Sequence, residues 1–169
     1  MRVIKRTSYT GRQPSDLYFA NVYSPFVSRT ILLCNSCEIL LAGAFKKLGL
    51  TYKKRTLGQK LETLKRQRDR LVKSLGREAF DQLVASIDLT NQHFNRAKHA
   101  YMVLDDANAK DPRLLEPGFN FATMNVMILD STTEEVSVLT PADRQRFEDD
   151  IRDTIERLEA MLNRIGQVS

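Results

Sequence analysis

The chain has 169 residues, of which 42% are apolar and 28% charged, with seven Gly and five Pro. This is the composition of an ordinary globular protein, and it excludes collagen-like, low-complexity and wholly disordered chains. The net charge of +5 hides an asymmetry. Residues 1–75 carry 16 Lys and Arg against 4 acids, a net +12, while residues 76–169 carry 10 against 17, a net −7. Such a chain can present a basic surface to a polyanion, or its basic N-terminal half can pair with its acidic C-terminal half.

The cysteines and the N-terminal sequence bear on the compartment. Cys34 and Cys37 are the only cysteines, so we expect a reducing environment rather than a disulfide framework. The basic N-terminus is not followed by a signal-like apolar segment, and the longest apolar run, residues 39–45, is short of a membrane span. The prediction is a cytoplasmic protein without a membrane partner.

The first helices are predicted from apolar spacing and capping signals. Residues 1–15 form a basic tail, and a helical segment opens at Ser15 and Asp16. Ser24 is expected to be an N-cap, with Pro25 as the first residue of the next helix. That helix runs to Leu48 and is apolar around most of its circumference. We therefore expect it to be central and buried.

Two further helices follow. Thr56 and Gln59 have the spacing of a capping box, and leucines then recur on one stripe as far as Leu75, which predicts one helix over 56–75. The next helix has an inner face that is apolar at first and then turns polar. This predicted face comprises Phe80, Leu83, Val84, Ile87, Asn91, Phe94, Asn95, Lys98 and, at its end, Tyr101.

The C-terminal third begins with a loop over 105–118, followed by strands over 119–129 and 134–139 that form a hairpin. Thr140, Pro141 and Asp143 then provide a strong helix start. The predicted fold is mainly α, an antiparallel bundle of four to five helices with the β-hairpin 119–139 inserted before the last helix. Residues 16–169 are expected to form one domain.

One short segment concentrates the polar chemistry. NQHFNRAKHAY (91–101) holds both histidines, two asparagines, an Arg and a Lys. On the predicted inner face, such groups would form either a catalytic patch, with His99 available for acid–base chemistry, or a set of hydrogen-bonded core residues. Periodicity alone leaves both interpretations open.

Glu38 and the two cysteines are further candidate sites. A carboxylate in the middle of an apolar helix needs a cation, for which Arg96, Lys98 and His99 are candidates. The pair would be structural or an auxiliary of catalysis. A zinc site built from both cysteines and both histidines is disfavoured, because Cys34 and Cys37 lie mid-helix and His93 and His99 face different directions. We expect neither a metal nor another cofactor.

The segment 53–73 is the most basic of the chain, with nine Lys and Arg against Glu62 and Asp69. Such a helix face could bind RNA or DNA through phosphates without reading bases, or it could simply be a solvated surface. The candidate nucleic-acid-binding residues are Lys60, Lys65, Arg66, Arg68, Arg70 and Lys73.

Three segments together resemble the HEPN superfamily of small helical proteins. NSCEILLAGAFKKLGL (35–50) resembles its first core helix, TLGQKLETLK (56–65) the opening of the next, and 91–101 the place of its polar Arg, Asn and His motif. The resemblance covers about residues 16–104 and the last helix. It implies a helical bundle that pairs as a homodimer. Family members are metal-independent RNases of toxin–antitoxin, phage-defence and RNA-processing systems, or non-catalytic binding modules.

The chain departs from the catalytic motif of that family. Catalytic members have an Arg with four to six residues between it and the His, and the corresponding positions before His99 hold Phe94, His93 and Gln92. A variant site would use Arg96 to stabilise phosphate charge and His99 to move a proton, with Asn91 and Asn95 beside them.

The sequence therefore predicts a HEPN-like protein that binds or cleaves RNA, with an RNA, an antitoxin or another protein as its partner. The alternative is a non-catalytic helical module whose hairpin edge at 119–139 recruits a protein partner.

Overall fold

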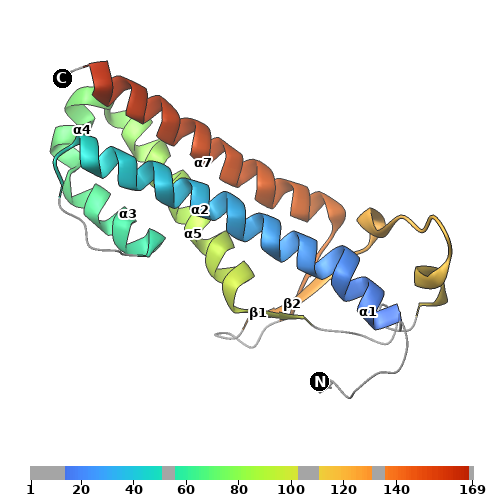
Figure 1. Cartoon of the computed structure of the whole chain (residues 1–169). Coiled ribbons are helices and arrows are strands. Elements are labelled where there is room, and N and C mark those ends of the chain that lie inside the picture. The colour runs from blue at the N-terminus through green and yellow to red at the C-terminus, as the bar shows by residue number, and fades with distance from the viewer. Residues whose placement is uncertain (1–13, 51–55, 103–110, 131–135, 168–169) are drawn as a thin grey trace. The chain divides into compact units, whose positions relative to one another are not determined.

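The structure is a computed structural model that describes residues 14–50, 56–102, 111–130 and 136–167 (Figure 1). The predicted fold class is confirmed, because the chain is mainly helical and a small antiparallel hairpin precedes the last helix. The helices and strands are α1 (Pro14–Tyr18), η1 (Phe19–Tyr23), α2 (Ser24–Lys47), α3 (Leu57–Arg66), α4 (Arg68–Leu75), α5 (Arg77–His99), β1 (Ala100–Met102), η2 (Pro112–Leu115), η3 (Phe121–Thr123), β2 (Val126–Asp130), β3 (Val136–Leu139) and α7 (Pro141–Gln167).

The chain groups into two compact units, and the three long helices α2, α5 and α7 contribute to both. The first unit comprises Met1–Arg29 and Arg96–Arg146, and the second comprises Thr30–Asn95 and Phe147–Ser169. Residues 1–13 of the predicted basic tail and part of the loop at 105–118 lie outside the described residues, as do residues 131–135 of the hairpin.

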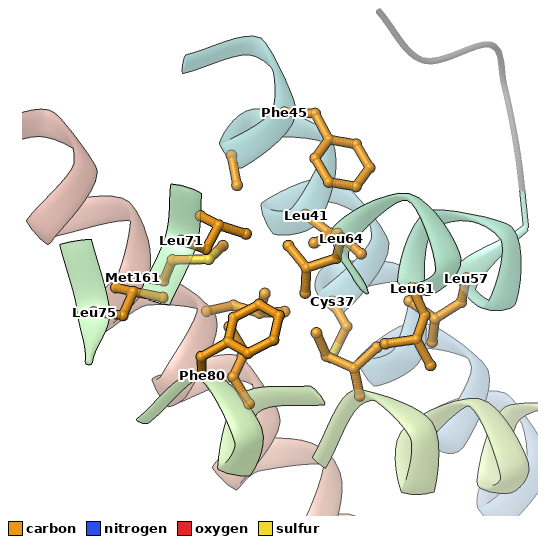
Figure 2. Packing of buried hydrophobic residues seen from close by; sticks show 14 of the residues in the cluster. Cys37, Leu41, Phe45, Leu57, Leu61, Leu64, Leu71, Leu75, Phe80 and Met161 are labelled. Carbon is orange, nitrogen blue, oxygen red and sulfur yellow. The ribbon is translucent and has the colours of Figure 1, made fainter. Parts of the chain in front are cut away.

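The second unit is a helical bundle around one apolar core. Leu41 and Phe45 of α2, the leucines of α3 and α4, Phe80 of α5 and Met161 of α7 point toward one another in this core (Figure 2). Contacts of α7 with α2 link Cys37 to Ile151 and Lys47 to Leu162, so these two helices run parallel. The contacts of α7 with α5 join Asp150 to His93 and Arg157 to Gln82. Residue numbers therefore rise along α7 as they fall along α5, so α5 is antiparallel to both α2 and α7.

The predicted capping box at Thr56 is present, and the predicted helix start at Thr140 has the same two reciprocal hydrogen bonds. The Gln59 N–H donates to Thr56 Oγ1 at 3.4 Å, and the Thr56 N–H donates to Gln59 Oε1 at 3.1 Å. At the start of α7, the Asp143 N–H donates to Thr140 Oγ1 at 3.1 Å, and the Thr140 N–H donates to Asp143 Oδ2 at 2.9 Å. These bonds satisfy N–H groups that have no partner within the helix and so fix where α3 and α7 begin.

α2 begins at Ser24, within one residue of the predicted start, but the predicted N-cap at Ser24 was wrong. Ser24 has helical dihedral angles, and its N–H donates to the Phe19 carbonyl five residues back, so α1, η1 and α2 follow one another without a cap. A proline inside a helix lacks an N–H, and its ring clashes with the carbonyl four residues earlier. The wider π-turn directly before Pro25 accommodates that ring without ending the helix.

The expectation that α2 is central and buried holds for one side of the helix and not for the other. Its buried line includes Cys34, Cys37 and Leu41, but the side chains of Leu32 and Ile39 are 66% and 71% exposed. By length and composition, the helical stretch Asp16–Lys47 is long and apolar enough to cross a membrane, and 28% of its most apolar part is buried. The core helix of a soluble protein and a signal sequence near an N-terminus share this length and composition.

The segment predicted as one helix over 56–75 is two helices. Gln67, with φ −96° and ψ 17°, separates α3 from α4. Leu57, Leu61 and Leu64 remain buried before the break, as do Leu71 and Leu75 after it. The leucine stripe predicts these buried positions correctly, but periodicity does not show that the axis changes at Gln67.

The first unit contains a three-stranded antiparallel sheet of order β1-β2-β3. β2 pairs with β3, as the predicted hairpin requires, and also with β1, where Ala100 lies opposite Asp130. β1 was not predicted, because its sequence continues the helical pattern of α5. Pairing with β2 determines its strand conformation, as tertiary contacts often override local preference.

The predicted strand at 119–129 is shorter than expected. Residues Phe121–Thr123 form a 3-10 turn, capped where the Ala122 N–H donates to the Asn120 side chain at 3.1 Å, and β2 begins at Val126. Arg144 Nη2 donates to the Ala122 and Met124 carbonyls at 2.9 and 2.7 Å. The turn is therefore held by its own Asn and by an arginine from the start of α7.

Candidate nucleic-acid interface

The buried polar groups of α5 are not the ones that the sequence suggested. Asn95, Lys98 and His99 are exposed, and Asn91 is half-buried, so the predicted inner face was wrong at Asn95 and Lys98, although Phe94 does pack against the core. The positions that continue the buried face are Thr90, His93 and Ala97. The difference arises because the stripe advances by steps of three from Ile87 to Thr90 and His93 rather than by a step of four to Asn91.

The first buried polar contact joins α5 to α7 through two threonines. Thr90 Oγ1 donates to Thr154 Oγ1 at 2.8 Å, and the Thr154 hydroxyl lies 3.0 Å from the carbonyls of Ser86 and Asp150. Both threonines are fully buried. A chain of satisfied hydroxyls in an apolar core holds two helices in one register, which is a structural role.

The second buried polar contact involves His93. Its Nε2 lies 2.9 Å from Asp150 Oδ2, and its ring stacks on Phe147 with the centroids 3.8 Å apart. The imidazole side chain is only 7% exposed, whereas that of Asp150 is 30% exposed. A ring covered in this way does not meet a macromolecular substrate, so His93 also belongs to the packing of α5 on α7.

Asn91 lies where α5 passes the start of α3. A Cβ atom at Gly58 would come within 3.3 Å of the Asn91 side-chain nitrogen. The glycine therefore allows a close approach of the two helices, and Asn91 fills the contact. Asn91 has a packing role here whatever else it does.

The candidate catalytic pair lies near the end of α5. Arg96 and His99 are three positions apart and exposed, and neither makes a hydrogen bond or ion pair with another described residue. Residues at this spacing are neighbours on a helix surface. The two groups are thus accessible to a substrate. Asn95, which directly precedes Arg96, is also exposed, whereas Asn91 is partly covered.

Glu38 has its cation, but the residue is Lys60 and not one of the three predicted. Lys60 Nζ lies 3.0 Å from Glu38 Oε2, and the two side chains are 8% and 24% exposed. Lys98 is exposed on α5. Because Lys60 is buried and paired with Glu38, its ammonium group is not available to a nucleic acid.

The remaining basic residues of that set are all exposed on α3 and α4. Lys65 pairs with Glu62 at 2.8 Å and Arg68 with Asp81 at 3.3 Å, and all four side chains are more than 40% exposed. Arg70 Nη1 donates to the Leu48 carbonyl at 2.9 Å. We call this surface the α3–α4 basic face, and it consists of Lys65, Arg66, Arg68, Arg70 and Lys73.

Two members of the α3–α4 basic face form neither an ion pair nor a hydrogen bond with the described residues. Arg66 and Lys73 are exposed and make no hydrogen bond or ion pair with the described part of the chain. The acids on these two helices are Glu62 and Asp69 only. The face therefore keeps a positive charge after its internal pairs are counted.

The cysteines are buried rather than available as ligands. Both are 0% exposed, and burial raises the pKa of each thiol to about 12. For Cys34 the nearby Cys37 and Glu38 raise the pKa further. Among the described residues, no group of three or more His, Cys, Asp or Glu side chains could hold a metal ion.

Comparisons with known proteins add no relative, since no protein family, curated protein or solved structure matches the chain.

Proposed function

We propose that this protein is a cytoplasmic, HEPN-like helical protein that binds RNA through the α3–α4 basic face. The observation that carries the proposal is the exposure of five cationic side chains on two consecutive short helices that carry only two acids. Phosphate backbones attract such a surface irrespective of base sequence.

The internal ion pairs of this face do not prevent binding. The Lys65–Glu62 and Arg68–Asp81 pairs are solvent-exposed, and exposed pairs contribute only about 0–1 kcal/mol. A phosphate group can therefore replace the carboxylate at little cost, and the guanidinium of Arg68 can contact it through two N–H groups. Arg70 is exposed and gives only Nη1 to the Leu48 carbonyl, so all five cations can contribute to phosphate contacts.

The salt dependence of affinity tests this proposal. Five phosphate contacts predict that the logarithm of the association constant falls against the logarithm of salt concentration with a slope of about −3 to −4. Fluorescence anisotropy with a labelled RNA of mixed sequence measures it. An affinity that does not change with salt, or an absence of binding in low salt, would refute the proposal and favour a protein partner.

A second candidate function is RNA cleavage, and the exposure of Arg96 and His99 on neighbouring positions of α5 favours it. His99 would accept the proton of a ribose 2′-hydroxyl while that oxygen attacks the adjacent phosphorus and the bond to the 5′-oxygen breaks, and a water molecule would protonate the leaving 5′-oxygen. Arg96 would stabilise the charge on the phosphate. The products would be a 2′,3′-cyclic phosphate and a 5′-hydroxyl.

Cleavage has its own experiment. A labelled RNA incubated with the protein in EDTA should be cut, and His99→Ala and Arg96→Ala should each abolish cutting while binding remains. Exposed Lys98 provides the control, because Lys98→Ala should still cut. Intact RNA across a range of pH would dismiss cleavage and leave the binding function, in which the protein would act with an antitoxin or another partner.

A further inference from the structure

A small pocket opens on the helical bundle of the second unit, between the end of α4, the first turns of α5 and the C-terminal half of α7. It has a volume of about 130 Å³ and reaches solvent past Ala160 and Arg164, which are exposed. Leu75 and Met161 of its lining also belong to the apolar core and lie side by side there (Figure 2). We call this site the α4–α5–α7 pocket, and its lining residues are Leu75, Ala79, Leu83, Arg157, Ala160, Met161 and Arg164.

The lining combines an apolar wall with two guanidinium groups. Ala79 on α5 and Ala160 on α7 both line the pocket, and their small side chains leave the space that a larger side chain would fill. Arg157 and Arg164 are the charged residues of the lining, and they lie two turns apart on one side of α7. An apolar hollow with a few polar groups is typical of a ligand site. Because both charged groups are guanidiniums, they indicate an anionic ligand.

Each guanidinium has hydrogen-bond donors left for a ligand. Arg157 Nε donates to Asp153 Oδ2 at 2.7 Å and its Nη1 to Gln82 Oε1 at 2.8 Å, so its Nη2 is the nitrogen without an acceptor in the described part of the chain. Arg164 Nη1 donates to the Leu75 carbonyl at 3.2 Å, while its Nε and Nη2 have no acceptor among the described residues. The N–H groups of Nε and Nη2 lie along one edge of a guanidinium, where they can bind both oxygens of a carboxylate.

Charge and volume restrict the ligand. Asp153 pairs with Arg157, so two guanidiniums less one carboxylate leave a net charge of +1 at the pocket. A single carboxylate neutralises this charge, whereas a phosphate monoester carries about −1.5 to −2 at neutral pH. The pocket is close in volume to a protein cavity of about 150 Å³ that binds benzene, and well below the roughly 300–1,000 Å³ of sites for drug-sized ligands. A nucleotide is therefore too large, and a single ring or branched chain fits.

We infer that the α4–α5–α7 pocket binds a small carboxylic acid with an aromatic or branched apolar group. The apolar group lies between the two alanines of the lining, and the carboxylate accepts hydrogen bonds from Nε and Nη2 of Arg164 at the opening. Arg157, which Asp153 and Gln82 hold in place, adds its Nη2 as a further donor. The inference does not depend on RNA binding, because no lining residue belongs to the α3–α4 basic face.

An NMR titration of the isotope-labelled full chain with sodium benzoate tests the inference. Benzoate should shift the amide resonances of residues 75–83 and 157–164, with a dissociation constant of about 0.1–10 mM. Benzyl alcohol has the ring without the charge and acetate the charge without the ring, so each should bind at least about tenfold more weakly. The absence of shifts at about 20 mM benzoate, or an equal affinity for either control compound, would overturn the inference.

A change of volume at the opening locates the ligand. Ala160→Leu fills space in the pocket and should weaken benzoate binding at least about tenfold. Ala85→Leu is the matched control, because Ala85 is an exposed alanine of α5 outside the lining, and it should bind benzoate as the wild type does. Both variants keep a good helix former, so both should fold. An Ala160→Leu variant that binds benzoate as tightly as the wild type would contradict the inference.

A change of charge tests the role of Arg164. Arg164→Gln should weaken benzoate at least about fivefold and leave the affinity for benzyl alcohol unchanged, because the neutral ring does not use the guanidinium. Arg152→Gln, at an exposed arginine of α7 outside the lining, should change neither affinity. Thermal unfolding of each variant checks that it is folded. An unchanged benzoate affinity in folded Arg164→Gln would show that this guanidinium does not hold the carboxylate, and the inference would be wrong.

Discussion

Lys60 and Glu38 form a largely covered ion pair that ties α3 to α2, with Nζ and Oε2 3.0 Å apart. Removing one member of a buried pair leaves the other charge without compensation. Lys60→Ala should therefore lower the free energy of unfolding by about 1–3 kcal/mol, measured by urea denaturation. Lys60→Met/Glu38→Leu should recover most of that loss. The control, Lys65→Ala, breaks a similar but exposed pair on α3 and should cost less than about 0.5 kcal/mol. Equal losses for Lys60→Ala and Lys65→Ala would contradict the structure.

Thr154 connects α7 to α5 through the buried hydroxyl of Thr90. Thr154→Val removes the hydroxyl and leaves Thr90 without its acceptor, which should cost about 1–3 kcal/mol of stability. Thr90→Val/Thr154→Val should cost less than the sum of the two single changes, since neither hydroxyl is then left alone. Additive losses in this double-mutant cycle would show that the two side chains do not interact.

The two thiols should make stability depend on alkaline pH. The pKa of Cys34 and Cys37 is about 12 in the folded chain because of burial, against about 8.5 in an unfolded chain. Above about pH 9 the unfolded state binds fewer protons than the folded state, so the free energy of unfolding falls as pH rises.

The thiol contribution can be isolated by comparing the wild type with Cys34→Ala/Cys37→Ala between pH 7.5 and 10.5. The stability advantage of the wild type should shrink with pH, by at most about 1.4 kcal/mol per pH unit for each thiol. A constant difference would mean that the thiols titrate normally. Likewise, a thiol reagent should react at pH 8 only after the protein is denatured.

The sequence predicts the helices better than it predicts the site. Capping residues Thr56 and Thr140 act locally, so the starts of α3 and α7 could be read from the sequence. The strand β1 and the break at Gln67 depend on contacts with distant residues, and no local pattern shows them.

The polar contacts of the core were missed for a related reason. A threonine on an apolar stripe, such as Thr90 three positions after Ile87, is a signal that sequence analysis could use. The partner of the Glu38 carboxylate cannot be read from a sequence pattern. Lys60 and the three cations near the end of α5 are equally plausible partners until the helices are placed in space. Exposure of Lys65, Arg66 and Lys73 agrees with their position off the leucine stripe.

The most direct test of the central claim, RNA binding by the α3–α4 basic face, is the RNA affinity of Arg66→Glu/Lys73→Glu beside that of Arg152→Glu. Arg152 is an exposed arginine on α7, outside the basic face. We expect the double variant to bind RNA at least tenfold more weakly, with a salt slope smaller in magnitude by about 1.5 to 2, since two phosphate contacts are lost. The Arg152→Glu variant should keep an affinity close to that of the wild type. An equal loss in both variants, or no loss in the double variant, would contradict the claim.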